Sequence, residues 1–287
     1  MPSEDTSGCL DGWKSKIKMV DAVRVEIEFK SSESKYLRMF SGAYVRGFVY
    51  WVIARNNRSL ASELHENKNL APYATSPVFG EKGVVEKLEE GKTYRFSVSF
   101  FVPEIGEVIK EYITSTGEIF FAGTSNRLKT ARVQYFDFNI DEFEPIEKFA
   151  VNFVTPCYFR IPSNKYRFLP LPYPPLMFRS LARLYEAFVA ELPLNYRSWL
   201  DKHAIAISGC NIRTEKVTLK KGMWTVGFIG RANFTIPKDT YNEEFARITA
   251  ALLKFGEISN VGGGRTSGFG VMRVENMESA TDLATSS

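Results

Sequence analysis

The chain has 287 residues, of which 44% are hydrophobic and 24% are charged, proportions typical of a folded globular protein with room for two domains. No run of 18 or more apolar residues occurs, which excludes a transmembrane helix. The formal net charge is +4, and residues 151–235 hold twelve basic but only four acidic side chains. This basic segment predicts a polyanionic partner, although a solvated basic surface would explain the charge as well.

The first 18 residues lack an apolar stretch after a basic region, so they predict a disordered leader rather than a secretory signal. The three cysteines, Cys9, Cys157 and Cys210, are far apart, and the chain has only two histidines. Neither residue type shows metal-ligand spacing, so no metal site and no cofactor are expected. We expect reduced thiols in a cytoplasmic protein that does not contact a membrane.

The first half of the chain alternates strand and helix patterns. Residues 22–30 alternate apolar and polar side chains, which predicts a strand, and residues 41–56 carry apolar residues at helical spacing after Ser41 as N-cap. The next predicted elements are a helix at 59–68 capped by Ser59, a strand at 92–101, a helix at 104–115 and strands at 118–123 and 130–140.

The second half repeats this order. Its predicted elements are a strand at 148–161, a helix at 175–192, strands at 204–220 and 223–236, a helix at 242–258 and a strand at 270–277. Each half approximates strand-helix-strand-strand-helix-strand, which predicts an α+β protein of two tandem ferredoxin-like (RRM-like) domains, βαββαβ twice. An acidic linker at 139–148 divides the predicted domains, 19–143 and 144–276, and a disordered tail is expected at 277–287.

The segment "NVGGGRTSGFG" (260–270) has five glycines and lies between a predicted helix and a predicted strand. The phosphate-binding loops of nucleotide-binding proteins follow a strand and precede a helix. This segment follows a helix and precedes a strand, so it is not expected to be such a loop. Successive glycine N–H groups can instead cradle the phosphates of RNA, with Arg265 adding a charge. A helix cap followed by a tight turn is the alternative, but it needs only one or two glycines.

Cations and aromatic side chains alternate in residues 157–179, a composition suited to RNA phosphates and stacked bases. Aromatic residues of an ordinary core would explain the same pattern. The candidate RNA-binding residues of the whole chain are Arg46, Arg160, Lys165, Arg167, Lys220, Lys221, Arg231, Gly262, Gly264, Arg265, Gly268 and Gly270.

Tyr50 and His65 are candidates for proton transfer. Tyr50 lies off the apolar stripe of the predicted helix at 41–56, beside Arg46 one turn earlier. His65 lies at the edge of the apolar face of the following short helix. A histidine can accept or donate a proton at neutral pH, whereas the alternative for a lone histidine is a structural role.

Three stretches carry a resemblance to a known family. They are the glycine-rich "NVGGGRTSGFGVMRVE", the series "VRGFVYWVI", "LASELHENK" and "YATSPVFG", and "NFVTP" followed by a "PLP" run and a helix. On these residues the chain resembles, from about residue 20 to 275, the Cas6 family of CRISPR-associated endoribonucleases, which process precursor CRISPR RNA. The glycine-rich loop is shared with the wider superfamily of repeat-associated RNA-binding proteins.

The resemblance implies metal-independent cleavage within CRISPR repeats, in which a 2′-hydroxyl attacks the neighbouring phosphate and leaves a 2′,3′-cyclic phosphate and a 5′-hydroxyl. Tyr50 and His65 match the family's tyrosine and histidine positions. The position of the family lysine is Ala71 here, and Lys68 is the candidate for its role. The implied partners are CRISPR repeat RNA, a CRISPR effector complex and a second copy of the chain. The alternatives are a non-catalytic RNA-binding subunit of an effector complex and a general single-strand RNA binder.

Overall fold

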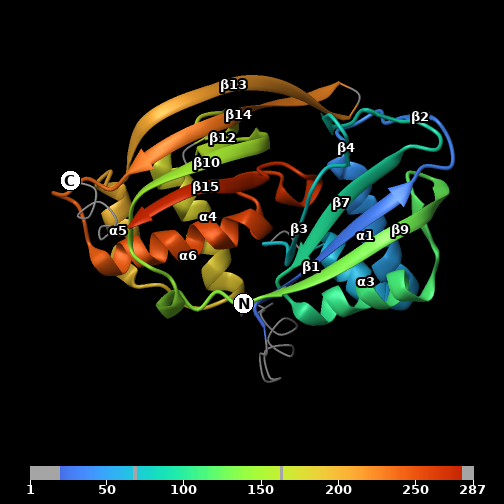
Figure 1. Ribbon diagram of the computed structural model, residues 1–287, viewed down its shortest axis with the longest axis horizontal. Helices are drawn as coiled ribbons and strands as arrows, with labels where there is room; N and C mark the ends of the chain where they lie inside the picture. The colour runs from blue at the N-terminus through green and yellow to red at the C-terminus, as the bar shows by residue number, and fades with distance from the viewer. Residues whose placement is uncertain (1–19, 67–69, 162–163, 221, 280–287) are drawn as a thin grey trace, which may run out of the picture.

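The computed structural model describes residues 20–66, 70–161, 164–220 and 222–279. The predicted leader at 1–18, Lys68 and Lys221 lie outside these residues. Two antiparallel sheets lie side by side, each with helices packed on one face (Figure 1). No helix in the described ranges is both long and apolar enough to span a membrane.

The first sheet has the strand order β5-β4-β7-β1-β9-β8, and β3 also pairs with β7. Its strands are β1 (Ala22–Lys30), β3 (Tyr73–Thr75), β4 (Phe79–Gly80), β5 (Gly83–Val84), β7 (Thr93–Phe100), β8 (Glu118–Phe121) and β9 (Thr124–Phe136). β2 (Lys35–Tyr36) and β6 (Lys87–Leu88) form a separate pair. The central β1 lies between β7 and β9, as the ferredoxin-like order requires.

Helices α1 (Gly42–Asn56) and α3 (Pro103–Ser115) cover one face of this sheet, and α2 (Arg58–Glu66) follows α1. The alternation along β1 explains the packing, because Val23, Val25 and Ile27 are buried in the core shared with α1 and α3. The intervening residues of β1 are polar and face away from these helices. One face of the sheet is therefore left open for the second half of the fold.

The second sheet has the order β13-β14-β10-β15, again with the first strand of its half between two neighbours. Its elements are β10 (Ile146–Cys157), α4 (Pro174–Phe188), α5 (Leu194–Asp201), β13 (Ala206–Lys220), β14 (Met223–Thr235), α6 (Glu243–Ser259) and β15 (Met272–Ser279). A hairpin of β11 (Phe159–Ile161) and β12 (Asn164–Leu169) and the 3₁₀ turns η2 (Ile140–Glu142) and η3 (Arg265–Ser267) complete the described elements. The α+β fold with duplicated ferredoxin-like order is confirmed.

Several local expectations differ from the structure. Ser41 precedes α1 as expected, but its Oγ accepts a hydrogen bond from the Val78 N–H at 3.1 Å instead of capping the helix. Asn57, not Ser59, caps α2, because its Oδ1 accepts from the Leu60 N–H at 3.0 Å. The single strand expected at 148–161 is divided into β10 and β11. Residues 277–279 of the expected tail belong to β15.

Candidate active site and cleft

The glycine-rich segment forms a contact between the two halves of the fold. Its turn η3 packs on α1 and β3 of the first half, where the red segment before β15 reaches β3 in Figure 1. A Cβ on Gly42, the first residue of α1, would lie 2.0 Å from the Ser267 carbonyl oxygen. Gly268 has φ +82°, and its Cβ would lie 2.6 Å from the Pro77 nitrogen. These glycines therefore permit a close approach of backbones that any side chain would prevent.

Several N–H groups of the segment are already used inside the protein. Gly262 donates to Ser180 Oγ at 3.2 Å, Gly263 to the Tyr158 carbonyl at 2.9 Å and Gly270 to the Pro156 carbonyl at 3.0 Å. These bonds hold the segment against β10 and α4. The phosphate cradle expected from the glycines is thus partly occupied by the protein's own acceptors.

Arg265 was expected to present a charge to RNA, but its side chain is only 8% exposed. Its Nη1 donates to the Ser259 carbonyl at 3.3 Å, at the end of α6. Burial lowers the pKa of the guanidinium to about 10, an effect opposed by Tyr73 and reinforced by Arg183. The structure places this charge inside the fold rather than on the surface.

Tyr50 lies half-buried on α1 and reaches the segment that carries His65. Its hydroxyl donates to the Leu64 carbonyl at 3.2 Å, so it is held one residue before His65. The backbone of His65 belongs to α2, and its side chain lies outside the described part of the structure. Arg46 is exposed one turn before Tyr50 on the same helix. The structure therefore brings the Tyr50 hydroxyl next to the backbone of His65, with Arg46 one turn earlier on α1.

Tyr73 of β3, which the sequence did not indicate, adjoins this group. Its ring meets the Tyr50 ring edge-on, with centroids 6.2 Å apart and an interplanar angle of 87°. Burial raises the pKa of the Tyr73 phenol, Tyr50 raises it further, and Arg46 and Thr266 act in the opposite direction. Residues of α1, β3 and η3 thus surround one buried hydroxyl.

The other candidate RNA-binding residues lie on the second half. Arg160 is exposed on β11, next to Tyr158, whose ring packs against Phe269 of the glycine-rich segment with centroids 5.6 Å apart. Arg231 of β14 is exposed but forms an ion pair with Glu275 at 3.1 Å. The backbones of Lys165, Arg167 and Lys220 belong to β12 and β13, and their side chains lie outside the described residues.

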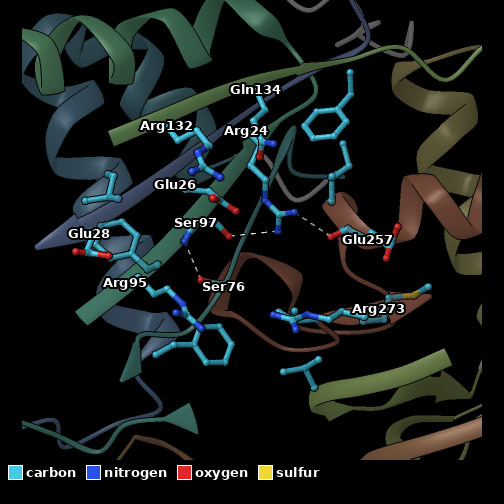
Figure 2. Close-up of a pocket in the computed structure, with 18 of the residues that line it drawn as sticks. Arg24, Glu26, Glu28, Ser76, Arg95, Ser97, Arg132, Gln134, Glu257 and Arg273 are labelled. Atoms are coloured by element: carbon cyan, nitrogen blue, oxygen red, sulfur yellow. Dashed lines mark hydrogen bonds between the residues drawn. The ribbon is translucent and has the colours of Figure 1, made fainter. Parts of the chain in front are cut away.

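A cleft of about 720 Å³ separates the open face of the first sheet from α6 and β15 (Figure 2). We call its basic residues the cleft cations: Arg24, Arg95, Arg132, Lys254 and Arg273. In Figure 2, Arg95 and Arg273 point into the cleft from opposite sides. Glu26, Glu28 and Glu257 also line it. The alternation along β1, β7 and β9 predicts a polar sheet face, but it does not reveal what lies opposite.

Arg24 crosses this cleft and joins the two halves. Its guanidinium donates to Ser97 Oγ at 3.3 Å and to the Glu257 carbonyl of α6 at 3.4 Å (Figure 2). Burial lowers its pKa, and the carboxylates of Glu26 and Glu257 oppose that effect. The cleft is therefore closed at this end by a hydrogen-bonded contact between β1, β7 and α6.

Metal ligands were not expected from the sequence. Among the residues with described positions, no group of three or more His, Cys, Asp or Glu side chains is arranged to hold a metal ion. Cys157 is buried and Cys210 exposed, and neither forms a disulfide, whereas Cys9 lies outside the described residues.

Sequence comparison identifies relatives of part of the chain. The family model for the CRISPR-associated endoribonuclease Cas6 matches residues 151–272. Two curated proteins of that name, from Mycobacterium tuberculosis strains CDC 1551 / Oshkosh and ATCC 25618 / H37Rv, are 38% identical over 136 residues. That match covers 45% of this chain and 39% of each relative, so it spans less than half of the relatives' length.

Solved structures share the fold of nearly the whole chain. Two Cas6 product complexes superpose with TM-scores of 0.72 and 0.70 at 19% and 24% identity, each covering 89% of this chain and 99% of the other. Thermus thermophilus Cas6 superposes with a TM-score of 0.65 at 20% identity, covering 89% of this chain and 98% of that one. The chain therefore has the fold of Cas6 structures, and the match at residues 151–272 confirms its resemblance to the Cas6 family of CRISPR-associated endoribonucleases.

Proposed function

We propose that this chain is an endoribonuclease that cleaves precursor CRISPR RNA within its repeats without a metal ion. The proposal is supported by the family match at residues 151–272 and by the names of the curated relatives. The observation that carries it is the contact of η3 with α1, which joins the matched segment to the helix that carries Tyr50. RNA held along the second half would then lie beside Tyr50 and the segment of His65.

In the proposed reaction, a ribose 2′-oxygen attacks the adjacent phosphorus in line and loses its proton to a general base. The bond between phosphorus and the 5′-oxygen breaks, and that oxygen takes a proton from a general acid. The products are a 2′,3′-cyclic phosphate and a 5′-hydroxyl. Because the nucleophile belongs to the substrate, the protein has to supply in-line geometry and proton transfer. Acid–base catalysis of this kind contributes a factor of about 10²–10⁴ in rate.

Tyr50 and His65 are the proposed acid–base residues. A cation beside the scissile phosphate would stabilise the charge that develops on it. Lys68 is proposed for that role on the basis of the family resemblance, and Arg46 is the described cation nearest to Tyr50 on α1. These roles can be tested by single substitutions, because the Tyr50 hydroxyl contacts the Leu64 carbonyl, one residue before His65.

The proposed partner is CRISPR repeat RNA, and the cleft cations supply a basic surface for its backbone. One solved structure of this fold is described as an RAMP protein binding different RNA substrates, with a TM-score of 0.58 and 13% identity. Another is a Cas6 substrate mimic complex, with a TM-score of 0.65 and 22% identity. Delivery of the product to a CRISPR effector complex and pairing with a second copy of the chain belong to the same proposal.

The deciding experiment incubates the protein with labelled repeat RNA from its own genome in excess EDTA and maps the product ends. We expect one cut per repeat, with a cyclic phosphate on the upstream product. Loss of cleavage on chelation would contradict the metal-independent mechanism. Tight repeat binding without cleavage under any condition would favour a non-catalytic subunit of an effector complex.

His65→Ala tests the catalytic assignment within that assay. We expect the single-turnover rate to fall at least about tenfold, with little change in RNA affinity, because a proton-transfer group acts mainly in the transition state. The matched control is His203→Ala, since the chain has two histidines and His203 lies near Tyr173 in the second half. An unchanged rate for His65→Ala would exclude His65 from the reaction.

A further inference from the structure

Asn260 is a buried residue whose backbone has a conformation that asparagine rarely adopts. It follows the last residue of α6 with φ 55° and ψ 169°, and it is only 2% exposed. A left-handed residue usually has ψ of about +30° to +60°, and positive φ with ψ of about 180° is occupied almost only by glycine. Ala122 and His203, the other non-glycine residues with positive φ in the described part of the chain, lie in turns and are not buried. The strain at Asn260 is therefore held inside the fold.

The end of α6 alone does not explain an asparagine at this position. A glycine after the last helical residue ends a helix with positive φ and without strain. Backbone strain of this kind persists only where the surrounding structure compensates for it, and it is concentrated at functional sites. The Asn260 side chain must therefore provide something that glycine lacks.

The Asn260 side chain joins the two halves of the fold. Its Nδ2 donates to the Thr75 carbonyl of β3 at 2.8 Å and to the Arg265 carbonyl of turn η3 at 3.3 Å. Directly after it, the Val261 N–H donates to the Gly270 carbonyl at 2.9 Å and closes the base of the glycine-rich segment. One amide group therefore fixes turn η3 to β3 at the point where the segment leaves α6.

Turn η3 connects this amide to the surroundings of Tyr50. The turn packs on both α1 and β3. Burial raises the pKa of the Tyr73 phenol in β3, and the side chain of Thr266 in the turn opposes that shift. The Tyr73 ring in turn meets the edge of the Tyr50 ring, with centroids 6.2 Å apart. A displacement of η3 from β3 would therefore reach the Tyr50 phenol through packed side chains.

We infer that Asn260 is a positioning residue for RNA cleavage, which fixes turn η3 against β3 and so sets the position of Tyr50 relative to bound RNA. This inference rests on the proposed function. The glycine-rich segment belongs to the second half and Tyr50 to the first, so their relative position decides whether the scissile phosphate lies beside Tyr50. A misplacement of about 1 Å can lower a rate about a hundredfold.

Asn260→Gly removes the side-chain bonds and also relieves the backbone strain. We expect the single-turnover rate on saturating repeat RNA to fall about 10–100-fold, because η3 is no longer fixed, while the RNA dissociation constant changes little. The unfolding temperature should stay close to that of the parent protein, because the relieved strain offsets part of the loss of the bonds. An unchanged cleavage rate would overturn the inference.

Asn126→Gly is the matched control. Asn126 is 1% exposed, and its Nδ2 donates to the Phe121 and Thr124 carbonyls at 3.2 and 2.8 Å, all within the first half. Its φ is not positive, so glycine relieves no strain there. We expect Asn126→Gly to unfold at a lower temperature than Asn260→Gly but to cleave RNA at the normal rate. Rate losses in proportion to stability in both variants would make Asn260 a structural residue and refute its positioning role.

A double-mutant cycle tests whether Asn260 acts through Tyr50. In the Tyr50→Phe background, Asn260→Gly should cause little further loss of rate, because residues that act as a unit are not additive. Fully additive losses would overturn this inference and leave the proposed function intact. No cleavage by the parent protein, or a normal rate for Tyr50→Phe, would overturn the proposed reaction or its tyrosine, and this inference with it.

Discussion

Two arginines, the half-buried Arg24 and the buried Arg265, meet the carboxyl-terminal end of α6. Arg24 donates to the Glu257 carbonyl at 3.4 Å, and Arg265 to the Ser259 carbonyl at 3.3 Å. The last carbonyls of a helix lack partners within it and form the negative end of its dipole. The two guanidinium groups supply both hydrogen-bond donors and positive charge at this end. Arg265 therefore has a structural partner that the glycine-rich sequence around it does not suggest.

We expect Arg265→Ala to lower the free energy of unfolding by about 2–3 kcal/mol, because it removes a charged donor and leaves a buried carbonyl unpaired. Urea denaturation would measure the change. Arg247→Ala is a matched control on the same helix, where a half-exposed side chain pairs with the exposed Glu243 one turn away at 3.3 Å. It should cost no more than about 0.5 kcal/mol.

The opposite result would restore the RNA-binding prediction for Arg265. If Arg265→Ala unfolded at the same urea concentration as the parent protein but bound repeat RNA more weakly, its guanidinium would serve RNA rather than α6. The two measurements together separate a structural cation from a phosphate-binding one.

At the scale of elements, the packing of α1 on turn η3 depends on the absence of a side chain at Gly42. Gly42→Ala would place a methyl group 2.0 Å from the Ser267 carbonyl oxygen, so one of the two backbones must move. We expect a loss of about 1–3 kcal/mol in unfolding free energy and a slower cleavage rate, because the movement displaces the helix that carries Tyr50.

Gly47→Ala supplies the control for this change on the same helix. A methyl group at Gly47 would have no atom within 4 Å, and alanine favours helices over glycine by about 1 kcal/mol. We therefore expect Gly47→Ala to be neutral or stabilising and to leave cleavage unchanged. Equal behaviour of the two variants would mean that the contact between α1 and η3 is not needed.

Strong periodicity made some elements predictable. The strand at 22–30 is β1 without change, and the helices at 104–115 and 242–258 match α3 and α6 to within one residue at each end. The short elements α5, β11 and β12 were not predicted. Helix α5 buries only three of its eight residues, and the strands of the β11–β12 hairpin are too short to show a clear period. The ferredoxin-like order was therefore predictable, and its insertions were not.

The candidate site was predictable only where its residues are close in sequence. Tyr50 and His65 lie on consecutive helices, so their proximity could be expected from the short connection. Tyr73 and Thr266 meet through a tertiary contact between β3 and η3, which no local pattern encodes. The same holds for Arg24, whose alternation on β1 predicts a polar face but not its bond to α6. The glycine content of residues 260–270 predicted an unusual loop. The structure shows that a residue such as Gly268 lies too close to another backbone segment to carry a side chain.

At the scale of the whole molecule, the cleft between the two sheets is lined by the cleft cations together with Glu26, Glu28 and Glu257. We expect Arg95→Ala and Arg273→Ala each to weaken the binding of repeat RNA and to reduce the slope of log affinity against log salt concentration by about 0.7–1, because each change removes one phosphate contact and its released counterion. Filter binding over a range of salt concentrations would measure both quantities.

The control for charge alone is Arg197→Ala, because Arg197 belongs to α5 of the second half and forms an ion pair with Glu186. It should leave the salt slope unchanged. A normal slope for both cleft variants would mean that the RNA backbone follows another surface.

The contact of the glycine-rich segment with the first half has a consequence for protein synthesis. The Asn260 side chain donates to the Thr75 carbonyl at 2.8 Å across a separation of 185 residues, and turn η3 begins shortly after it at Arg265. A chain still being translated can form β1, α1 and β3 well before this turn leaves the ribosome. The surroundings of Tyr50 are then incomplete until the chain has been made as far as turn η3. Under the proposed function, a nascent chain without turn η3 would not cut RNA, and activity would begin only when η3 has docked on α1 and β3.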